Sequence, residues 1–176
     1  EIIKRRDFYN QENLLKEIAH KEDVAEKQRH KQEAYHRNIC VIKEKLEQNK
    51  AHLCFASIIN FFQYETDFDL IDYRESKVWK EFSSEEQKML AVSAKKYLEA
   101  IEDVPRHEYN RLYPLLPRAF YMVYTGLKEE FESFSEDVWK KYLLEVICYA
   151  QCDGKDILTP LLKQVFRIHP SVFSET

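Results

Sequence analysis

Glycine is almost absent from this chain of 176 residues, which contains only Gly126 and Gly154. Tight turns between many short strands depend on glycine and proline, and the chain has only five prolines. An all-β fold is therefore excluded. Glycine-rich loops that cradle phosphate are excluded as well, because they need several positions where the backbone approaches the phosphate without a Cβ atom in the way.

Long apolar runs and dense cysteine spacing are also missing. No run approaches the roughly 20 residues that span a bilayer, and the first residues show no signal-peptide pattern. The cysteines lack the spacing of a secreted disulfide scaffold, so we expect a cytoplasmic protein in which all of them are reduced: Cys40, Cys54, Cys148 and Cys152. The net charge of −4 attracts neither nucleic acid nor an anionic membrane, and we expect neither as a partner.

Residues 1–47 are predicted to form one long, charged amphipathic helix, the first of two domains. No proline or glycine occurs between Ile2 and Leu46, and strong helix formers dominate the composition. Apolar residues recur at steps of three and four near both ends, whereas residues 26–33 offer no apolar anchor. At 1.5 Å per residue the helix would reach about 65 Å, which exceeds the width of a domain of this size. We therefore expect part of it to project. Its start in mid-pattern is consistent with a fragment of a longer chain, and tag removal or processing would give the same start.

The next segments are predicted to be a turn, a buried helix and a loop. Residues 47–50 read as a turn, although an unbroken continuation of the first helix is the alternative. Residues 51–62 are apolar nearly all round, which predicts a buried helix. Residues 63–76 show no clear period and are expected to form an ordered loop, anchored by Trp79 and Phe82.

Helix-start signals occur twice in the second half of the chain. Ser83 and Glu86 have the Ser-x-x-Glu form of a capping box, in which each side chain satisfies one unpaired amide of the first turn. Phe134-Ser135 repeats the Phe82-Ser83 cue 52 residues later and is again followed by acidic residues, which suit a helix N-terminus. This recurrence is close to, but longer than, the period of roughly 40–47 residues that common helical-pair repeats show.

These signals predict an all-α fold in which residues 48–176 form an antiparallel HEAT- or TPR-like helical-repeat domain behind the long first helix. The aromatic residues recur at helical spacing and are not interleaved with Lys or Arg, so core packing is favoured over a platform for stacking bases. The predicted helices after the loop run from Ser83 to just before Pro105, from Leu115 to Gly126, from Ser135 to Ala150, and from Lys155 or Pro160 to Ile168.

One pair of residues fits a catalytic pattern. Arg29 and His36 match the loose R-x(4–6)-H pattern of helical ribonucleases of the HEPN type, in which the histidine acts on the ribose 2′-hydroxyl and the arginine steadies the phosphate. The pattern is permissive, and here it falls in the most polar stretch of the chain. A solvated charged face is favoured, so we assign no catalytic residue.

Three groups of residues have a spacing that could supply metal ligands. Cys148 with Cys152, and His36 with Cys40, each lie one helical turn apart, but a structural zinc ion needs four ligands. An aspartate cluster resembles part of a calcium loop but lacks the glycine and the terminal glutamate: Asp67, Asp69 and Asp72. We therefore predict no metal site and no cofactor.

The order of segments along the chain resembles a known class of helical regions. The resemblance rests on a charged helix, an apolar helix and an aspartate-bearing loop, and on these motifs: Ile42-Lys43-Glu44-Lys45-Leu46, Trp79-Lys80-Glu81-Phe82, Ala91-Val92-Ser93-Ala94-Lys95-Lys96-Tyr97-Leu98, Arg118-Ala119-Phe120, Ser135-Glu136-Asp137-Val138-Trp139 and Ile168-His169-Pro170-Ser171-Val172-Phe173. It is similar to the α-helical repeat regions that follow the ATPase module in large bacterial NTPases of the STAND/NACHT type, many of them linked to antiphage defence. The ATPase motifs themselves do not occur in this chain.

The resemblance implies a sensor or scaffold arm whose stacked helices present a broad surface to a protein ligand. We therefore expect a non-catalytic protein–protein interaction or regulatory segment of a larger intracellular protein, with protein partners that include other domains of the same chain. Two alternatives stay open: a HEPN-like ribonuclease that uses Arg29 and His36, and a coiled-coil dimerisation module built on residues 2–46.

Overall fold

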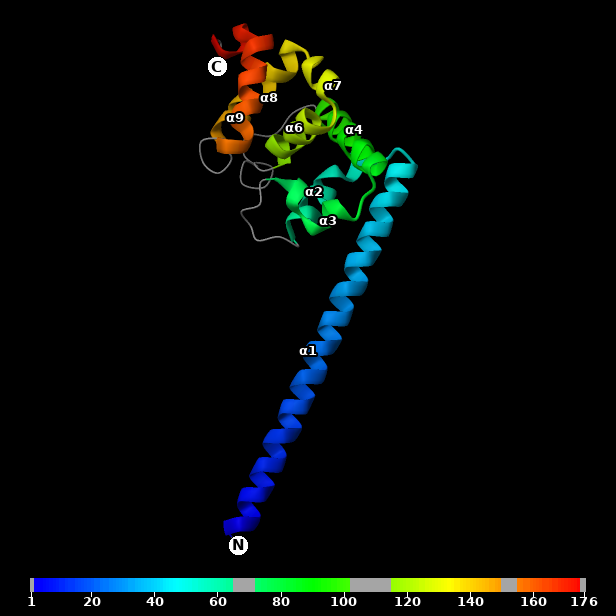
Figure 1. The fold of residues 1–176 in the computed structure, drawn as a ribbon, viewed down its shortest axis with the longest axis vertical. Coiled ribbons are helices and arrows are strands. Elements are labelled where there is room, and N and C mark those ends of the chain that lie inside the picture. Colours follow the sequence, from blue (N-terminus) through cyan, green and yellow to red (C-terminus); the bar gives the residue numbers. More distant parts are fainter. Residues whose placement is uncertain (1, 65–71, 102–114, 150–154, 175–176) are drawn as a thin grey trace. The chain divides into compact units, whose positions relative to one another are not determined.

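A computed structural model of the protein describes residues 2–64, 72–101, 115–149 and 155–174, and every regular element in these ranges is a helix (Figure 1). The predicted all-α class is confirmed. The chain divides into two units, Glu1–Val41 and Ile42–Thr176, and each is described separately below.

The first unit is a single helical segment. Helix α1 (Ile2–Glu47) runs through it without a break, as the absence of proline and glycine predicts. All described side chains from Lys16 to Ala34 are exposed, and even Ile18 keeps 45% of its surface accessible. Pairs one turn apart support this stretch, including an ion pair of 2.7 Å between Lys27 Nζ and Asp23 Oδ2.

Asn49 ends α1. It has a φ of 56°, in the left-handed region that favours glycine and, next to it, asparagine. The amide of Asn49 donates to the Leu46 carbonyl (2.9 Å), and that of Lys50 donates to the Lys45 carbonyl (2.8 Å). These two bonds form a Schellman motif, so the turn at residues 47–50 is confirmed and the unbroken helix is wrong.

The apolar segment after the turn consists of two short helices. A 3₁₀ helix, η1 (Ala51–Cys54), precedes α2 (Phe55–Tyr64). Ala51 and Phe55 are completely buried, whereas Leu53 is 75% exposed. The prediction of one buried helix over 51–62 was therefore wrong at its start, because the tighter 3₁₀ turn rotates Leu53 to the outside.

The capping box predicted for the next long helix is present. After η2 (Tyr73–Glu75) and α3 (Lys77–Lys80), helix α4 runs over Ser84–Ala100. Ser83 Oγ accepts from the Glu86 amide (3.2 Å), and Glu86 Oε2 accepts from the Ser83 amide (2.6 Å). Partial burial would raise the pKa of Glu86, but these bonds and Lys43, 3.1 Å away, outweigh it and hold the pKa below its ordinary value.

Helix α6 has the predicted bounds, Leu115–Gly126, and its last residue lies against α4. A Cβ atom built on Gly126 would come within 2.7 Å of the Ala91 Cβ atom, closer than two carbons can approach. The φ of Gly126 is not positive, so the backbone conformation does not require glycine here. The requirement comes from the close packing against Ala91. The short helix α7 (Lys128–Glu132), which the sequence analysis did not anticipate, follows.

The C-terminal part contains α8 (Glu136–Tyr149), α9 (Lys155–Ile168) and the 3₁₀ helix η5 (Pro170–Ser174). Pro160 lies inside α9, so the earlier of the two predicted starts is correct. The indole of Trp139 stacks on Phe120 from α6 at a centroid distance of 4.6 Å. Both rings are buried, which confirms that these aromatic residues serve the core.

Candidate functional site

The residues with a catalytic pattern are exposed on one helix. Arg29 and His36 both lie on α1 within the first unit, seven residues apart, and both side chains are exposed. The imidazole of His36 packs edge-on against the ring of the neighbouring Tyr35, with centroids 5.5 Å apart. Neither side chain forms an ion pair with another residue that the structure describes.

The structure brings no metal site together in the ranges that it describes. No group of three or more His, Cys, Asp or Glu side chains there could hold a metal ion. Cys40, Cys54 and Cys148 are free thiols, whereas Cys152, Asp67 and Asp69 lie outside the described residues. Of the three aspartates in the predicted cluster, only Asp72 lies in the described residues, and its carboxylate binds Arg74.

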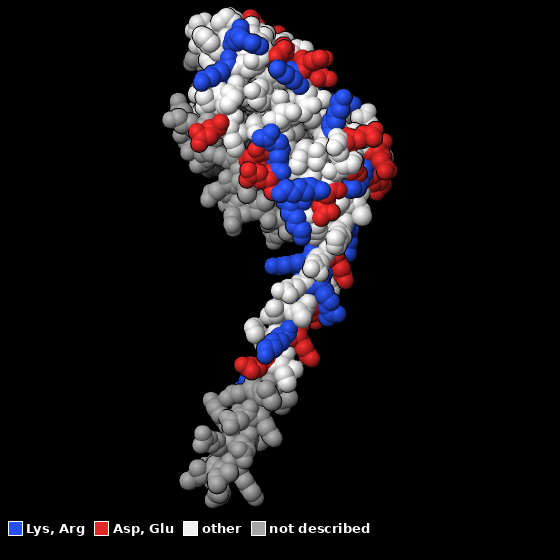
Figure 2. Space-filling view, viewed as in Figure 1, with Lys and Arg blue, Asp and Glu red and all other residues white. Residues whose placement is uncertain are grey.

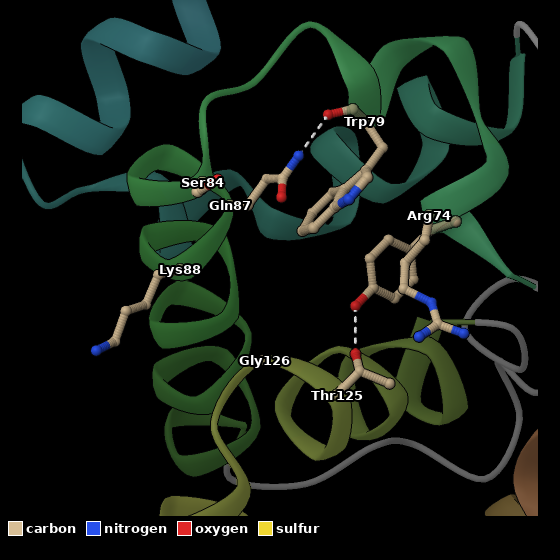
Figure 3. Close-up of a pocket in the computed structure, with 8 residues that line it drawn as sticks. Arg74, Trp79, Ser84, Gln87, Lys88, Thr125 and Gly126 are labelled. Carbon is tan, nitrogen blue, oxygen red and sulfur yellow. Dashed lines mark hydrogen bonds between the residues drawn. The ribbon is translucent and has the colours of Figure 1, made fainter.

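A cavity of about 350 Å³ lies in the second unit, between the α3–α4 region and the C-terminal end of α6 (Figure 3). Two aromatic side chains, two cationic ones and a set of small or amide groups line it: Tyr73, Arg74, Trp79, Ser84, Gln87, Lys88, Thr125 and Gly126. No acidic residue is among them. Its size is at the lower end of the range for ligand pockets, which suits one amino-acid side chain or a small molecule.

The Arg74 edge of the cavity is held by a three-residue network. Arg74 Nε donates to Asp72 Oδ1 (2.8 Å), and Arg74 Nη2 donates to both Asp72 Oδ2 (2.5 Å) and Tyr121 Oη (2.6 Å). The Tyr121 hydroxyl in turn donates to Asp72 Oδ2 (3.2 Å). The guanidinium also lies over the Tyr121 ring at 5.3 Å. Arg74 is therefore fixed in place and its charge is balanced.

The pKa values of this network keep its charges constant near neutral pH. Burial would raise the pKa of Asp72, but the hydrogen bonds and charge of Arg74 outweigh burial and lower it below 3.8. The hydrogen bond to Asp72 raises the pKa of Arg74. Burial, with the nearby Asp72 charge, raises the pKa of Tyr121 to about 12. None of the three changes its charge near pH 7, so the network suits positioning and binding better than proton transfer.

The aromatic wall consists of Trp79 and Tyr73. Their rings pack edge to face with centroids 4.6 Å apart. Tyr73 is 4% exposed, and its hydroxyl lies 2.5 Å from Thr125 Oγ1, which itself donates to the Tyr121 carbonyl (2.9 Å). Trp79 is only partly buried, and its indole presents surface to the cavity (Figure 3).

Gln87, in the first turns of α4, is fixed by its amide nitrogen. Gln87 Nε2 donates to the carbonyls of Trp79 (3.2 Å) and Phe82 (3.0 Å). Figure 3 shows that this arrangement turns the side-chain oxygen of Gln87 toward the cavity beside the indole. Because both hydrogens of the amide are used, Oε1 is an acceptor with a defined direction.

Lys88 is the cation at the rim. Its side chain is exposed and extends outward from α4 (Figure 3), and it has no ion-pair partner among the described residues. Elsewhere on the face drawn in Figure 2, cationic and anionic side chains of the second unit are interspersed. The cavity therefore differs from that surface in having cationic residues and no acidic residue in its lining.

We expected Trp79 to anchor the loop over residues 63–76, which contains Tyr73, but no sequence pattern singled out Arg74, Gln87, Lys88 or Thr125. The spacing of Tyr121 and Thr125 could have indicated part of the site, because it places two hydroxyl groups one turn apart on a mostly apolar helix. The other residues could not be found this way, because only the fold brings α4 next to the end of α6.

Replacing Asp72 with asparagine should reduce stability in a pH-dependent way. Because the pKa of Asp72 is lower in the folded chain than in the unfolded one, its stabilisation is present above about pH 4 and is lost as the pH falls through the folded pKa. The difference in unfolding free energy between wild type and Asp72→Asn should therefore be largest near pH 7 and shrink on acidification. Urea denaturation followed by circular dichroism measures it. Glu81→Gln, at an exposed carboxylate, is the control, and a pH-independent difference for Asp72→Asn would contradict the prediction.

No protein-family model matches this chain, and comparisons with curated proteins and with solved structures give no match. Among the described residues, no helix is both long enough and apolar enough to cross a membrane.

Proposed function

We propose that this chain is a non-catalytic protein–protein interaction and regulatory segment of a larger intracellular, cytoplasmic protein. The observation that carries the proposal is the cavity in the second unit, one of whose lining residues, Arg74, is hydrogen-bonded to Asp72 and Tyr121 outside the lining. The pKa values of these three side chains keep their charges constant near neutral pH. A site of this kind supplies shape, ring surface and charge to a partner, and little acid–base chemistry.

We further propose a helical-repeat arrangement of the HEAT or TPR type for the second unit. Two helices that follow Phe-Ser, α4 and α8, each contact the next described helix, α6 and α9 respectively. Helix α6 also contacts α8 and α9, so the two pairs adjoin (Figure 1). Repeats of this kind contact their neighbours and leave an extended surface for a partner.

The parent protein that fits this role best is an NTPase of the STAND type, in which a sensor or scaffold arm regulates an ATPase module. The support is the order of motifs described above, from residues 42–46 to residues 168–173. In such an arrangement, binding to the arm changes the populations of the states that restrain the rest of the protein. The partner is then either a separate protein or another domain of the same chain.

Site-specific crosslinking tests the proposed function. A photo-crosslinking amino acid is placed at Ser84, on the cavity rim, in the full chain expressed in cells, and at Lys163, an exposed position on α9, as the control. We expect a discrete protein adduct from position 84 that excess unmodified chain suppresses, and none from position 163. Identical adducts from both positions, or none from either, would argue against an interaction role at this cavity.

Catalysis by the α1 residues would overturn the proposal more directly. If the purified chain cleaved RNA, and if His36→Ala or Arg29→Ala abolished the cleavage, the segment would be a ribonuclease. A dimeric mass in light scattering that reverted to a monomer on disruption of residues 2–46 would instead favour the coiled-coil module.

A further inference from the structure

The cavity next to α4 combines three features that together specify a ligand. Its wall is aromatic, formed by Trp79 against Tyr73. Its fixed polar group is an acceptor, Gln87 Oε1, because the amide nitrogen of Gln87 is committed to two backbone carbonyls. Its uncompensated charge is the ammonium group of Lys88, because Arg74 is balanced by Asp72. A ligand that matches these three features has a planar or apolar group to pack on the aromatic wall. It has an N–H donor beside that group for Gln87 Oε1, and a negative charge on its outer part for Lys88.

We propose that the cavity binds an acidic peptide segment through a single aromatic or large apolar anchor residue. The anchor side chain packs on the indole of Trp79, the backbone N–H next to it donates to Gln87 Oε1, and a flanking carboxylate pairs with Lys88. The inference rests on the proposed function, and it adds the chemical class of the partner and the residues that select it.

The cavity volume and the position of Lys88 favour a peptide over a larger planar ligand. About 350 Å³ accommodates one large side chain with the backbone that bears it. Lys88 is among the lining residues, but Figure 3 shows its ammonium group turned away from Trp79 and Gln87, so only ligand groups that lie outside the cavity can pair with it. Buried aromatic anchors dominate the affinity of protein interfaces, whereas charges at the rim contribute mainly to selectivity and association rate.

The test is a titration of the ¹⁵N-labelled full chain, followed by the indole N–H signals of the two tryptophans. Trp139 is buried in the core, so its signal serves as an internal reference, and Trp79→Phe assigns the other signal. The probe is the acetylated and amidated peptide Asp-Glu-Phe-Glu-Asp. Three further probes separate the contributions of the anchor, of the charge and of a planar base. They are the same peptide with alanine in place of phenylalanine, the peptide Lys-Arg-Phe-Arg-Lys, and adenosine monophosphate.

The acidic phenylalanine peptide should shift the Trp79 signal saturably and leave the Trp139 signal in place. The alanine and basic peptides should bind at least about tenfold more weakly, since one loses the anchor and the other is repelled. Lys88→Glu should weaken the acidic peptide about tenfold and strengthen the basic one. Lys163→Glu, with the same change of charge at an exposed position on α9, should alter neither affinity by more than about twofold.

Three results would overturn the inference. They are an unmoved Trp79 signal at saturating acidic peptide, equal affinity for the three peptides, and a saturable shift with adenosine monophosphate alone, which would assign the cavity to a nucleotide. Crosslinking from Ser84 to a partner without peptide binding would refute only the peptide chemistry, whereas the loss of both would refute the proposed function as well.

Discussion

Replacing Trp139 with alanine should lower the free energy of unfolding by about 3–5 kcal/mol, the range measured for large aromatic truncations in cores. Trp139 is 1% exposed and contacts rings from three parts of the chain. Its indole stacks on Phe120 at 4.6 Å and meets Phe131 and Phe134 edge to face at 5.3 and 6.0 Å. Removing it would leave a void that these three rigid rings cannot fill, because their backbones lie in different places: Phe120 on α6, Phe131 on α7 and Phe134 in the connection from α7 to α8.

Urea denaturation followed by circular dichroism measures this loss. Leu144→Ala is the matched control, because Leu144 lies on the same helix, α8, but is 51% exposed. Truncation there should change the unfolding free energy by less than about 0.5 kcal/mol. If both variants lost similar stability, the described burial of α8 would be wrong.

Replacing Gly126 with alanine should destabilise the protein by about 1–3 kcal/mol, the usual cost of forcing an extra methyl group into a packed contact. Helix propensity alone gives the opposite sign, since alanine is a better helix former than glycine by about 1 kcal/mol. Packing is expected to win, because the new Cβ atom would lie 2.7 Å from the Ala91 Cβ atom on α4. Neither atom belongs to a flexible side chain, so only movement of a helix relieves the overlap.

A double-mutant cycle isolates this contact. Ala91→Gly removes the opposing methyl group at the cost of helix propensity, about 1 kcal/mol. The double variant Ala91→Gly/Gly126→Ala should therefore be more stable than the sum of the two single effects predicts. Additive effects, or a Gly126→Ala variant at least as stable as wild type, would show that α4 and α6 are not in contact at this point. Because Gly126 also lines the cavity, disruption should shift the Trp79 indole signal as well.

Local chemistry made several helix ends predictable. The capping box of Ser83 and Glu86 is formed entirely within one turn, so its residues could be read without the fold. The bounds Leu115–Gly126 followed from proline, which is tolerated only in the first turn of a helix, and from glycine at the other end. The sequence suggested that Gly126 serves to end the helix. In the structure its role is instead to let α4 pack closely against α6.

Other features depended on contacts that the sequence does not display. The exposure of Leu53 could not be foreseen, because periodicity identifies an apolar segment without saying where a 3₁₀ turn will rotate it. Asn49 adopts a left-handed conformation where no glycine is available, and its side chain accepts from Lys96 Nζ (2.8 Å) on α4. Helix α7 is only five residues long, too short for a periodic signal.

By itself, the amino-acid sequence determined the helical class, the unbroken α1 and the start of α4, because scarce glycine, strong helix formers and caps act within a few residues of one another. The cavity was decided only by tertiary structure. Its lining comes from segments some 50 residues apart, joined by a 2.5 Å contact between Tyr73 Oη and Thr125 Oγ1 and by the network of Asp72, Arg74 and Tyr121. Such groups become neighbours only when burial of apolar surface brings α4 and α6 together, and no local pattern encodes that pairing.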